Sequence, residues 1–331
     1  MAYDDELLKL QGPRLRGLTG TWRSKAQEEA FDPRQLIPKV GLDPIPPLHN
    51  IIVFERWDTY GHDQIWSMYP DGSNAVNISN SQTFDGDPCI SPDRSHIVFH
   101  RGILPGTYGI YKMAFDGSGQ VGLTPPAPGT LGDLAPCWSP DASKIAFSRN
   151  SQIWVMSASG TGAHPLMSYP TNPFCIDHAP AWKPDGSEIA FWRESGGTSA
   201  IMVVGVSGSA TPQYVTSPMA GWFDAWPAWK PDGLEIAFWR NDGKEAGVWK
   251  VGADGTGEVK LSHPDSKRGV SDWACCWSPD GLSLAFGRSP NTEFQIWTMT
   301  ANGASPPQPI SKPPKGPQRL IRFIDSQPSW A

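Results

Sequence analysis

Long hydrophobic runs are missing from this chain of 331 residues. No stretch approaches the roughly 20 apolar residues that a membrane-spanning helix needs, so we expect no membrane insertion. Basic residues are outnumbered, because 27 Lys and Arg stand against 33 Asp and Glu, a net charge of −6. A negatively charged chain is poorly matched to a phosphate backbone, so nucleic acid is not an expected partner.

Cysteine is also scarce, with five residues in the whole chain. An odd count favours a reducing compartment. The N-terminus lacks a basic segment followed by an apolar one, so no secretory signal is visible. Together these features predict a cytoplasmic protein, or a periplasmic or secreted one if a signal has been removed. Cys89, Cys137 and Cys276 each follow a repeated Asp by four residues, where other copies have Ala or Ser, which indicates packing in a small space.

Short motifs of common enzyme chemistry are missing as well. The sequence has no Cys-x-x-Cys, no Gly-x-Ser-x-Gly and no Gly-rich phosphate loop. Its one His-x-x-x-His, formed by His96 and His100, falls on an expected strand. At about 3.3 Å per residue the two rings would start roughly 13 Å apart, too far to share an ion. No cofactor is therefore predicted.

What the chain does contain is a repeated motif. Written loosely, it is Asp-x-x-Pro-x-Trp-(Ser/Lys)-Pro-Asp-Gly, an apolar run and then Phe-x-Arg. In five uninterrupted copies the Asp and its Arg are 16 positions apart, while successive Asp residues are 44 to 53 positions apart. A constant inner part with variable connections is typical of stacked supersecondary units. The leading residues are Asp85, Asp133, Asp177, Asp224, Asp272 and Asp325, and the closing residues are Arg56, Arg101, Arg149, Arg193, Arg240 and Arg288.

Each copy is expected to form four short strands. Runs rich in β-branched and aromatic residues are separated by Asp-Gly, Ser-Gly or Asn-Gly, which favour hairpins. Four antiparallel strands make one propeller blade. The last copy ends after its inner strand, whereas the first, from Ile51, lacks one. We therefore predict an all-β, six-bladed propeller over residues 47–331, with N- and C-terminal strands sharing the sixth blade, and a non-repeating arm over residues 1–46.

The repeat resembles that of the TolB-type six-bladed propellers. The matching segments are Trp138-Ser139-Pro140-Asp141, Trp182-Lys183-Pro184-Asp185-Gly186, Trp229-Lys230-Pro231-Asp232-Gly233 and Trp277-Ser278-Pro279-Asp280-Gly281. Ile90 departs from the pattern, since it stands where the other copies have Trp. The resemblance implies the fold over about residues 47–331. It says little about function, because propellers of this kind include interaction proteins, enzyme domains and lyases.

The Asp and Arg sets have two interpretations. The Asp opens the inner strand and the Arg closes the next, antiparallel strand, so both would lie at the same end of a blade. Six carboxylates around a channel could hold a cation. Six hydrogen-bonded Asp–Arg pairs would instead orient the loops. A matched Arg in every copy favours the structural pairs, and function is then expected where the copies differ.

Positions that differ between copies supply the candidate site. They follow the leading Asp or stand between the Phe and the Arg, and with nearby loops they would surround the channel mouth. The ligand-binding candidates are Trp57, Tyr60, Trp222, Phe223, Trp226 and Trp273, and the catalytic candidates are Glu55, His62, His100 and His178. Asp58 or Asp63 would complete an acid/base pair with Glu55.

These residues predict a binding protein that takes a small molecule, a carbohydrate or a peptide in an aromatic-lined funnel. The alternative is an enzyme, a lyase or hydrolase acting on a sugar-like or small aromatic substrate there. Its metal-assisted form would use His62, His100 and His178 around a divalent ion, as the resemblance to the His-rich site of oligogalacturonate lyases implies. Binding is favoured because no catalytic constellation stands out above the repeat.

Overall fold

The computed structural model describes residues 50–57, 63–104, 107–124, 132–167, 175–207, 211–217, 219–289, 295–311 and 325–330. The chain divides after Pro47, and all described residues lie in the part Leu48–Ala331. The predictions for residues 1–46 thus lie outside the described residues. The predicted all-β class is confirmed, because one short 3-10 helix, η2 (Ser266–Arg268), is the only helix among the described elements. No helix in the described part of the chain is long and apolar enough to cross a membrane.

The strands form antiparallel groups of four. The first group, in sheet order, is β24 (Asp325–Trp330), β1 (Ile52–Trp57), β2 (Asp63–Met68) and β3 (Val76–Asn77). The second is β4 (Phe84–Ile90), β5 (His96–Leu104), β6 (Thr107–Ala114) and β7 (Val121–Gly122). The third is β8 (Asp133–Trp138), β9 (Lys144–Arg149), β10 (Gln152–Ser157) and β11 (His164–Pro165).

The next two groups are joined into one larger sheet by a single parallel bridge, Ser199 to Phe223. They are β12 (Ile176–Trp182), β13 (Glu188–Ser195), β14 (Thr198–Gly205) and β15 (Gln213–Tyr214), and then β16 (Phe223–Trp229), β17 (Glu235–Asn241), β18 (Ala246–Gly252) and β19 (Val259–Lys260). The last group is β20 (Ser271–Trp277), β21 (Ser283–Ser289), β22 (Gln295–Thr300) and β23 (Gln308–Pro309).

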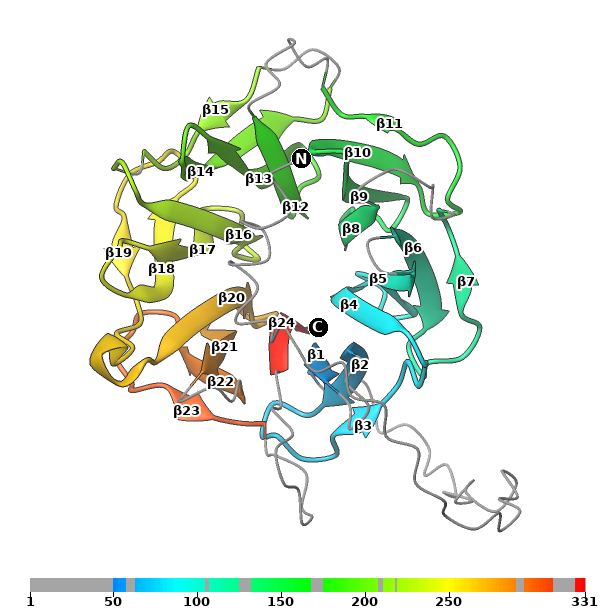
Figure 1. Cartoon of the computed structure of the whole chain (residues 1–331), viewed down its shortest axis with the longest axis horizontal. Helices are drawn as coiled ribbons and strands as arrows, with labels where there is room; N and C mark the ends of the chain where they lie inside the picture. Colours follow the sequence, from blue (N-terminus) through cyan, green and yellow to red (C-terminus); the bar gives the residue numbers. More distant parts are fainter. Residues whose placement is uncertain are drawn as a thin grey trace, which may run out of the picture. The chain divides into compact units, whose positions relative to one another are not determined.

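The groups follow one another around a common centre, and the first strand of each lies nearest to it (Figure 1). The innermost strands are β4, β8, β12, β16, β20 and β24, and each contacts the next in this order. β24 also contacts β4. All the repeated Asp residues stand at the beginning of these strands, which we call the Asp–Arg end, and the Pro-Asp-Gly turns follow at the other end.

Apolar side chains fill the space between neighbouring groups. The Phe of each Phe-x-Arg element is fully buried: Phe54, Phe99, Phe147, Phe191, Phe238 and Phe286 are all 0% exposed. Six core clusters of the described residues each draw on two successive groups, so that Ile153 and Val155, for example, pack with Phe191 and Met202. The turns between first and second strands suit their sequence, since Gly186 and Gly233 have φ of 73° and 70°, which glycine adopts without strain.

The three cysteines that follow a repeated Asp by four residues lie on innermost strands. Cys89 is in β4, Cys137 in β8 and Cys276 in β20. All five cysteines are free thiols. The Trp138 main-chain N–H donates a hydrogen bond to the Cys89 sulfur at 3.4 Å, so this thiol contributes to packing between neighbouring strands.

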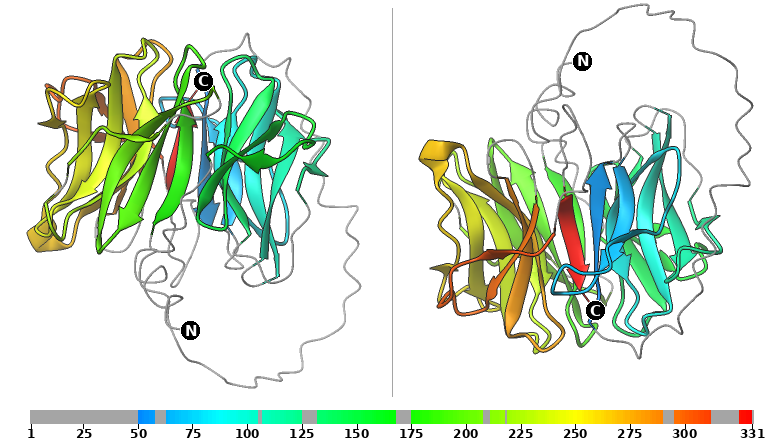
Figure 2. Two further views of the ribbon diagram at one scale, coloured as in Figure 1. Left: turned by 90° about the horizontal axis from the view of Figure 1, so that it is seen from above. Right: turned by 90° about the horizontal axis from the view of Figure 1, so that it is seen from below.

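The C-terminal strand completes the first group. β24 pairs antiparallel with β1, so that Ile52 lies opposite Trp330 and Arg56 opposite Asp325. Figure 2 shows the two strands side by side. The Ser329 hydroxyl also accepts a hydrogen bond from the Ile90 N–H at 3.2 Å, which ties β24 to the group β4–β7.

Deletion of residues 325–331 should therefore destabilise the whole set of sheets. The deletion removes the pairing with β1 and the packing of Trp330 against Ile52 and Phe54, and we expect a loss of at least about 3 kcal/mol of unfolding free energy. Urea unfolding would measure it, with a variant that lacks only Ala331 as the control. Equal midpoints for both variants would mean that β24 does not belong to this sheet.

Candidate functional site

The Asp–Arg end is held by two-point ion pairs. The Arg101 guanidinium donates from Nε to Asp85 Oδ1 at 2.6 Å and from Nη2 to Asp85 Oδ2 at 2.7 Å. The same geometry recurs in four further groups, with Asp133–Arg149, Asp177–Arg193, Asp224–Arg240 and Asp272–Arg288. Both oxygens of each carboxylate are occupied by its arginine. Of Asp325, only its backbone position opposite Arg56 is described.

The arginines also pack on aromatic rings. The Arg240 guanidinium carbon lies 5.0 Å from the centre of the Phe238 ring, 4.8 Å from that of Trp249 and 5.1 Å from that of Trp222. Each ion pair thus rests on core aromatics and fixes the start of an inner strand. The arrangement explains why these residues recur in every copy. Trp222 contacts the guanidinium of the Asp224–Arg240 pair.

The two sets of positions that differ between copies lie opposite each other. Across the first two strands of each group, the structure aligns Gly86 with His100, Leu134 with Ser148, His178 with Trp192, Ala225 with Trp239, Trp273 with Gly287 and Ser326 with Glu55. All six pairs stand next to the Asp–Arg pairs. The sequence differences therefore gather at one end of the innermost strands.

A β-bulge follows these positions. The next residue has a positive φ in five groups: Asp87 (50°), Ala135 (50°), Ala179 (48°), Trp226 (49°) and Ala274 (23°). Bulges re-aim side chains and are common beside functional sites. Asp87 was missed by the sequence analysis. The signal was available, because it is the one carboxylate at a position that holds Ala, Trp or Gln in the other copies.

Tryptophans fill one part of this end. The rings of Trp239 and Trp273 are stacked, with centroids 5.1 Å apart and planes 11° apart. Trp226 meets both rings edge-on at 5.5 and 5.9 Å. Phe223 and Trp192 pack against the same cluster. Trp239 is only 3% exposed, whereas Trp192, Trp226 and Trp273 keep part of their surface in contact with solvent.

Titratable side chains fill the adjoining part. The His100 Nδ1 lies 3.0 Å from Asp87 Oδ2, and that oxygen also accepts a hydrogen bond from the Ala135 N–H at 3.1 Å. Gly86 makes room for a further group. A Cβ at this position would lie 2.6 Å from His100 Cε1 and 2.7 Å from Glu55 Oε2. Any larger residue at position 86 would force the Glu55 carboxyl and the His100 ring apart.

The surroundings shift the pKa values of these groups. Burial, followed by the charges of Asp63 and Asp87, raises the pKa of Glu55 well above 4.5, although Glu55 keeps some contact with solvent. Burial opposes protonation of His100, but the charge and hydrogen bond of Asp87 outweigh it, so the pKa of His100 is raised. This end therefore brings a carboxyl group with a raised pKa beside a histidine that is held by a carboxylate.

His178 behaves differently. Burial lowers the pKa of His178 to about 4, and its ring stacks on Trp192 with centroids 4.6 Å apart. Its Nε2 is buried and has no hydrogen-bond partner among the described residues. His178 is thus a neutral ring at neutral pH, next to the aromatic part.

The structure brings together many of the predicted site residues. Glu55 and His100 are neighbours, and Trp226, Trp273 and Phe223 share one cluster. Tyr60, His62 and Asp58 lie outside the described residues, as does the side chain of Trp57. The described part of the chain holds no group of three His, Cys, Asp or Glu suited to a metal ion. A metal site that includes His62 stays a prediction.

Comparisons with known proteins concern the fold. A family model described as the TolB beta propeller domain matches residues 127–311. TolB from Acinetobacter baumannii has a TM-score of 0.66 at 17% identity, over 85% of this chain and 66% of that chain. The putative TolB from Agrobacterium tumefaciens gives 0.61 at 15% identity, over 80% of this chain and 89% of that chain.

An oligogalacturonate lyase from Vibrio parahaemolyticus has a TM-score of 0.51 at 12% identity, over 78% of this chain and 72% of that chain. At such identities the similarity concerns the fold alone. The chain spans slightly less than two thirds of the Acinetobacter protein, with 66% of it covered. None of the curated proteins matches this sequence.

Replacement of Glu55 by Gln should stabilise the protein at pH 7. Because the pKa of Glu55 is raised in the folded state, ionisation of the unfolded chain above about pH 4.3 disfavours folding, and a neutral amide escapes this effect. The gain in melting temperature should shrink as the pH falls towards 4. Glu188→Gln is the control, because it breaks an ion pair with Lys183 at 2.8 Å and should bring no gain. A Glu55→Gln gain that persists at pH 4 would contradict the raised pKa.

Proposed function

Because the chain belongs to the TolB beta propeller family, we propose that it is a closed six-bladed propeller that binds a ligand at its Asp–Arg end. The family model and the fold of the two TolB structures support the propeller. Pairing of β24 with β1, and the contacts of β24 with both β20 and β4, support closure by the first and last strands. Closure leaves no innermost strand with an open side.

The main support for a binding function is that the Asp–Arg end has a tryptophan part next to a part with titratable side chains. The tryptophan part is Trp192, Trp226, Trp239 and Trp273, and the titratable part is Glu55, Asp87, His100 and His178. Aromatic faces beside a few polar groups are typical of sites for small molecules and sugars, and they suit an aromatic residue of a peptide equally. The buried Nε1 atoms of Trp192 and Trp239 have no partner among the described residues.

The proposed ligand is therefore a flat molecule with an apolar face and polar edges. A sugar ring or an aromatic peptide side chain meets this description. The face of Trp273 or Trp226 would carry the apolar contact. Asp87 and His100 would receive the polar edge.

Binding can be tested by saturation-transfer NMR with three probes: a monosaccharide, indole and a blocked tryptophan dipeptide. We expect a signal from at least one probe and its loss, by about tenfold in affinity, in Trp273→Ala, since stacking contributes about 1 kcal/mol or more. Tyr214→Ala is the control, because Tyr214 is 67% exposed on β15. The absence of a saturation-transfer signal from all three probes, or a signal that is unchanged in Trp273→Ala, would count against the proposal.

A second candidate function is acid–base catalysis in the same place. It is favoured by Gly86, whose missing side chain lets the Glu55 carboxyl approach the His100 ring. Asp87 orients the imidazole, so that one group can accept a proton and the other can donate one. The reaction class would be a lyase or hydrolase acting on a sugar-like substrate, by analogy of fold with the oligogalacturonate lyase. A divalent metal with His62 as an additional ligand belongs to this candidate.

The catalytic candidate predicts that Gly86→Ala abolishes turnover of oligogalacturonate, followed by the absorbance of the unsaturated product. The new methyl group would separate Glu55 from His100 and should also cost about 1–3 kcal/mol of stability. Ala225→Gly is the matched control, since Ala225 holds the same repeat position in another group. Metal analysis of both variants would reveal an ion bound at His100 or His178. Wild-type protein without turnover and without metal would leave only the binding function.

A further inference from the structure

The opposite end of the sheets, where the Pro-Asp-Gly turns lie, carries a second set of repeated contacts. At two successive junctions a lysine of one group covers the repeat tryptophan of the next. The Lys183 ammonium lies 5.5 Å from the centre of the Trp229 ring, and the Lys230 ammonium lies 5.7 Å from that of Trp277. The Lys183 Cε comes within 3.5 Å of the Cβ position of Gly233, so that the methylene chain fills the groove.

Carboxylates hold each of these lysines in place. Lys183 Nζ lies 2.8 Å from Glu188 and 3.6 Å from Asp185. Lys230 Nζ lies 2.9 Å from Asp232 and 3.0 Å from Glu235. A tryptophan face below an ammonium, with acidic groups at its side, is a favourable setting for a cation. The chain thus builds the same lysine site twice from its own residues.

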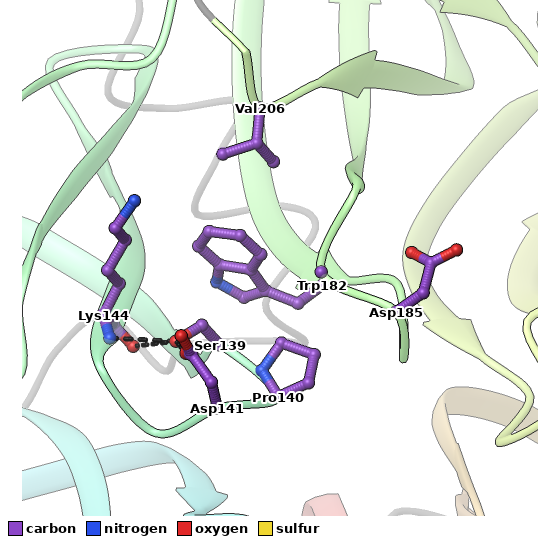
Figure 3. Close-up of a pocket in the computed structure, with 8 residues that line it drawn as sticks. Ser139, Pro140, Asp141, Lys144, Trp182, Asp185 and Val206 are labelled. Atoms are coloured by element: carbon purple, nitrogen blue, oxygen red, sulfur yellow. Dashed lines mark hydrogen bonds between the residues drawn. The ribbon is translucent and has the colours of Figure 1, made fainter.

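The preceding junction has the same tryptophan but no lysine above it. Ser139 stands where the next groups have Lys183 and Lys230, and Lys144 stands where they have Glu188 and Glu235. A Cβ at Gly186 would meet no atom within 4 Å, in contrast to Gly233. The result is a cavity of about 220 Å³ lined by Ser139, Pro140, Asp141, Lys144, Trp182, Asp185, Gly186 and Val206 (Figure 3). We call it the Trp182 socket.

The repeat tryptophans differ in one contact, because two of them donate a hydrogen bond from Nε1 and Trp182, like Trp138 and Trp330, does not. Trp229 Nε1 donates to the Ala181 carbonyl at 3.2 Å, and Trp277 Nε1 donates to the Ala228 carbonyl at 3.0 Å. Trp182 is 8% exposed, and its Nε1 has no hydrogen-bond partner among the described residues. In Figure 3 the nitrogen edge of this ring is on the side of Ser139. A lysine ammonium has no acceptor for this N–H, so what the socket offers to a cation is the face of the ring.

The charges at the socket favour a cation. Hydrogen bonds from Ser139 and Ser143 lower the pKa of Asp141 to about 2, and those from Ser187 lower the pKa of Asp185. Both carboxylates are therefore ionised at neutral pH. Lys144, which also lines the socket, opposes them in part. The socket should consequently bind a cation weakly, and better once Lys144 is replaced.

We propose that the Trp182 socket receives a lysine side chain from a partner protein. Its methylene chain would lie along the Trp182 face and its ammonium beside Asp141 and Asp185, as Lys183 lies over Trp229 within this chain. The proposal concerns the end opposite to the ligand site proposed above, and neither depends on the other.

The test uses three blocked tripeptides as probes: acetyl-Gly-Lys-Gly-amide, the same peptide with norleucine, and the same peptide with Nζ-acetyl-lysine. Binding is followed by the indole N–H signal of Trp182, assigned with Trp182→Phe. The lysine peptide should shift this signal at roughly millimolar concentration, and the two uncharged peptides should bind about tenfold more weakly. Equal shifts from all three peptides would show that the socket does not recognise the ammonium, which would overturn the proposal.

Variants that exchange the residues of the Trp182 socket with those of the lysine site over Trp229 give matched controls. Ser139→Lys with Lys144→Glu copies the Lys183–Glu188 pair into the socket, and binding of the lysine peptide should be lost. Lys144→Glu alone leaves the socket open and should strengthen binding about threefold or more. Lys183→Ser with Glu188→Lys should open an equivalent socket over Trp229, seen as a second responsive indole signal. Undiminished binding in the filled variant, or no second signal in the opened one, would refute the inference.

Discussion

The two-point hydrogen bond between a buried aspartate and an arginine is the contact on which the rest of this molecule depends. Five such pairs are described, and each carboxylate is 6% exposed or less. A buried charge is tolerated only when a partner compensates it, so each pair fixes the start of one inner strand and the end of its neighbour. The next residues on both strands are thereby presented at one end, in the same orientation, whatever their identity. A constant frame with exchangeable side chains is the result.

That frame explains how chemistry varies around the centre without a change of fold. At the same bulged position one group presents Asp87, another Trp226 and a third Ala179. The backbone conformation is shared, and only the side chain decides whether the local surface is acidic, aromatic or empty. The opposite end works similarly, since a change from Lys183 to Ser139 at one repeat position turns a filled groove into a cavity.

The repeat allowed much of this to be predicted from the sequence. The 16-residue spacing gives the register of Asp85 opposite Arg101, and the truncated copies predicted the neighbourhood of β24 and β1. Individual contacts at the Asp–Arg end were harder to predict, because some depend on a bulge or a missing side chain and others join residues of different groups. Asp87 contacts His100 beside a β-bulge, and the spacing of the repeat does not predict the bulge. Gly86 allows Glu55 to approach His100 only because it has no side chain. The stacking of Trp239 on Trp273 likewise joins neighbouring groups, whose relative placement sequence periodicity does not give.

The pairing of β1 with β24 has a consequence for biosynthesis. Residues 325–330 are translated long after their neighbours in the sheet, residues 52–57, because more than 250 residues lie between the two strands. At typical elongation rates of about 5–20 residues per second, the nascent β1 edge stays unpaired for on the order of 10 to 50 seconds. During this interval its apolar residues, Ile52 and Phe54 among them, are available to other nascent chains and to chaperones. Pairing of β1 in its sheet therefore has to wait until residues 325–330 have been synthesised.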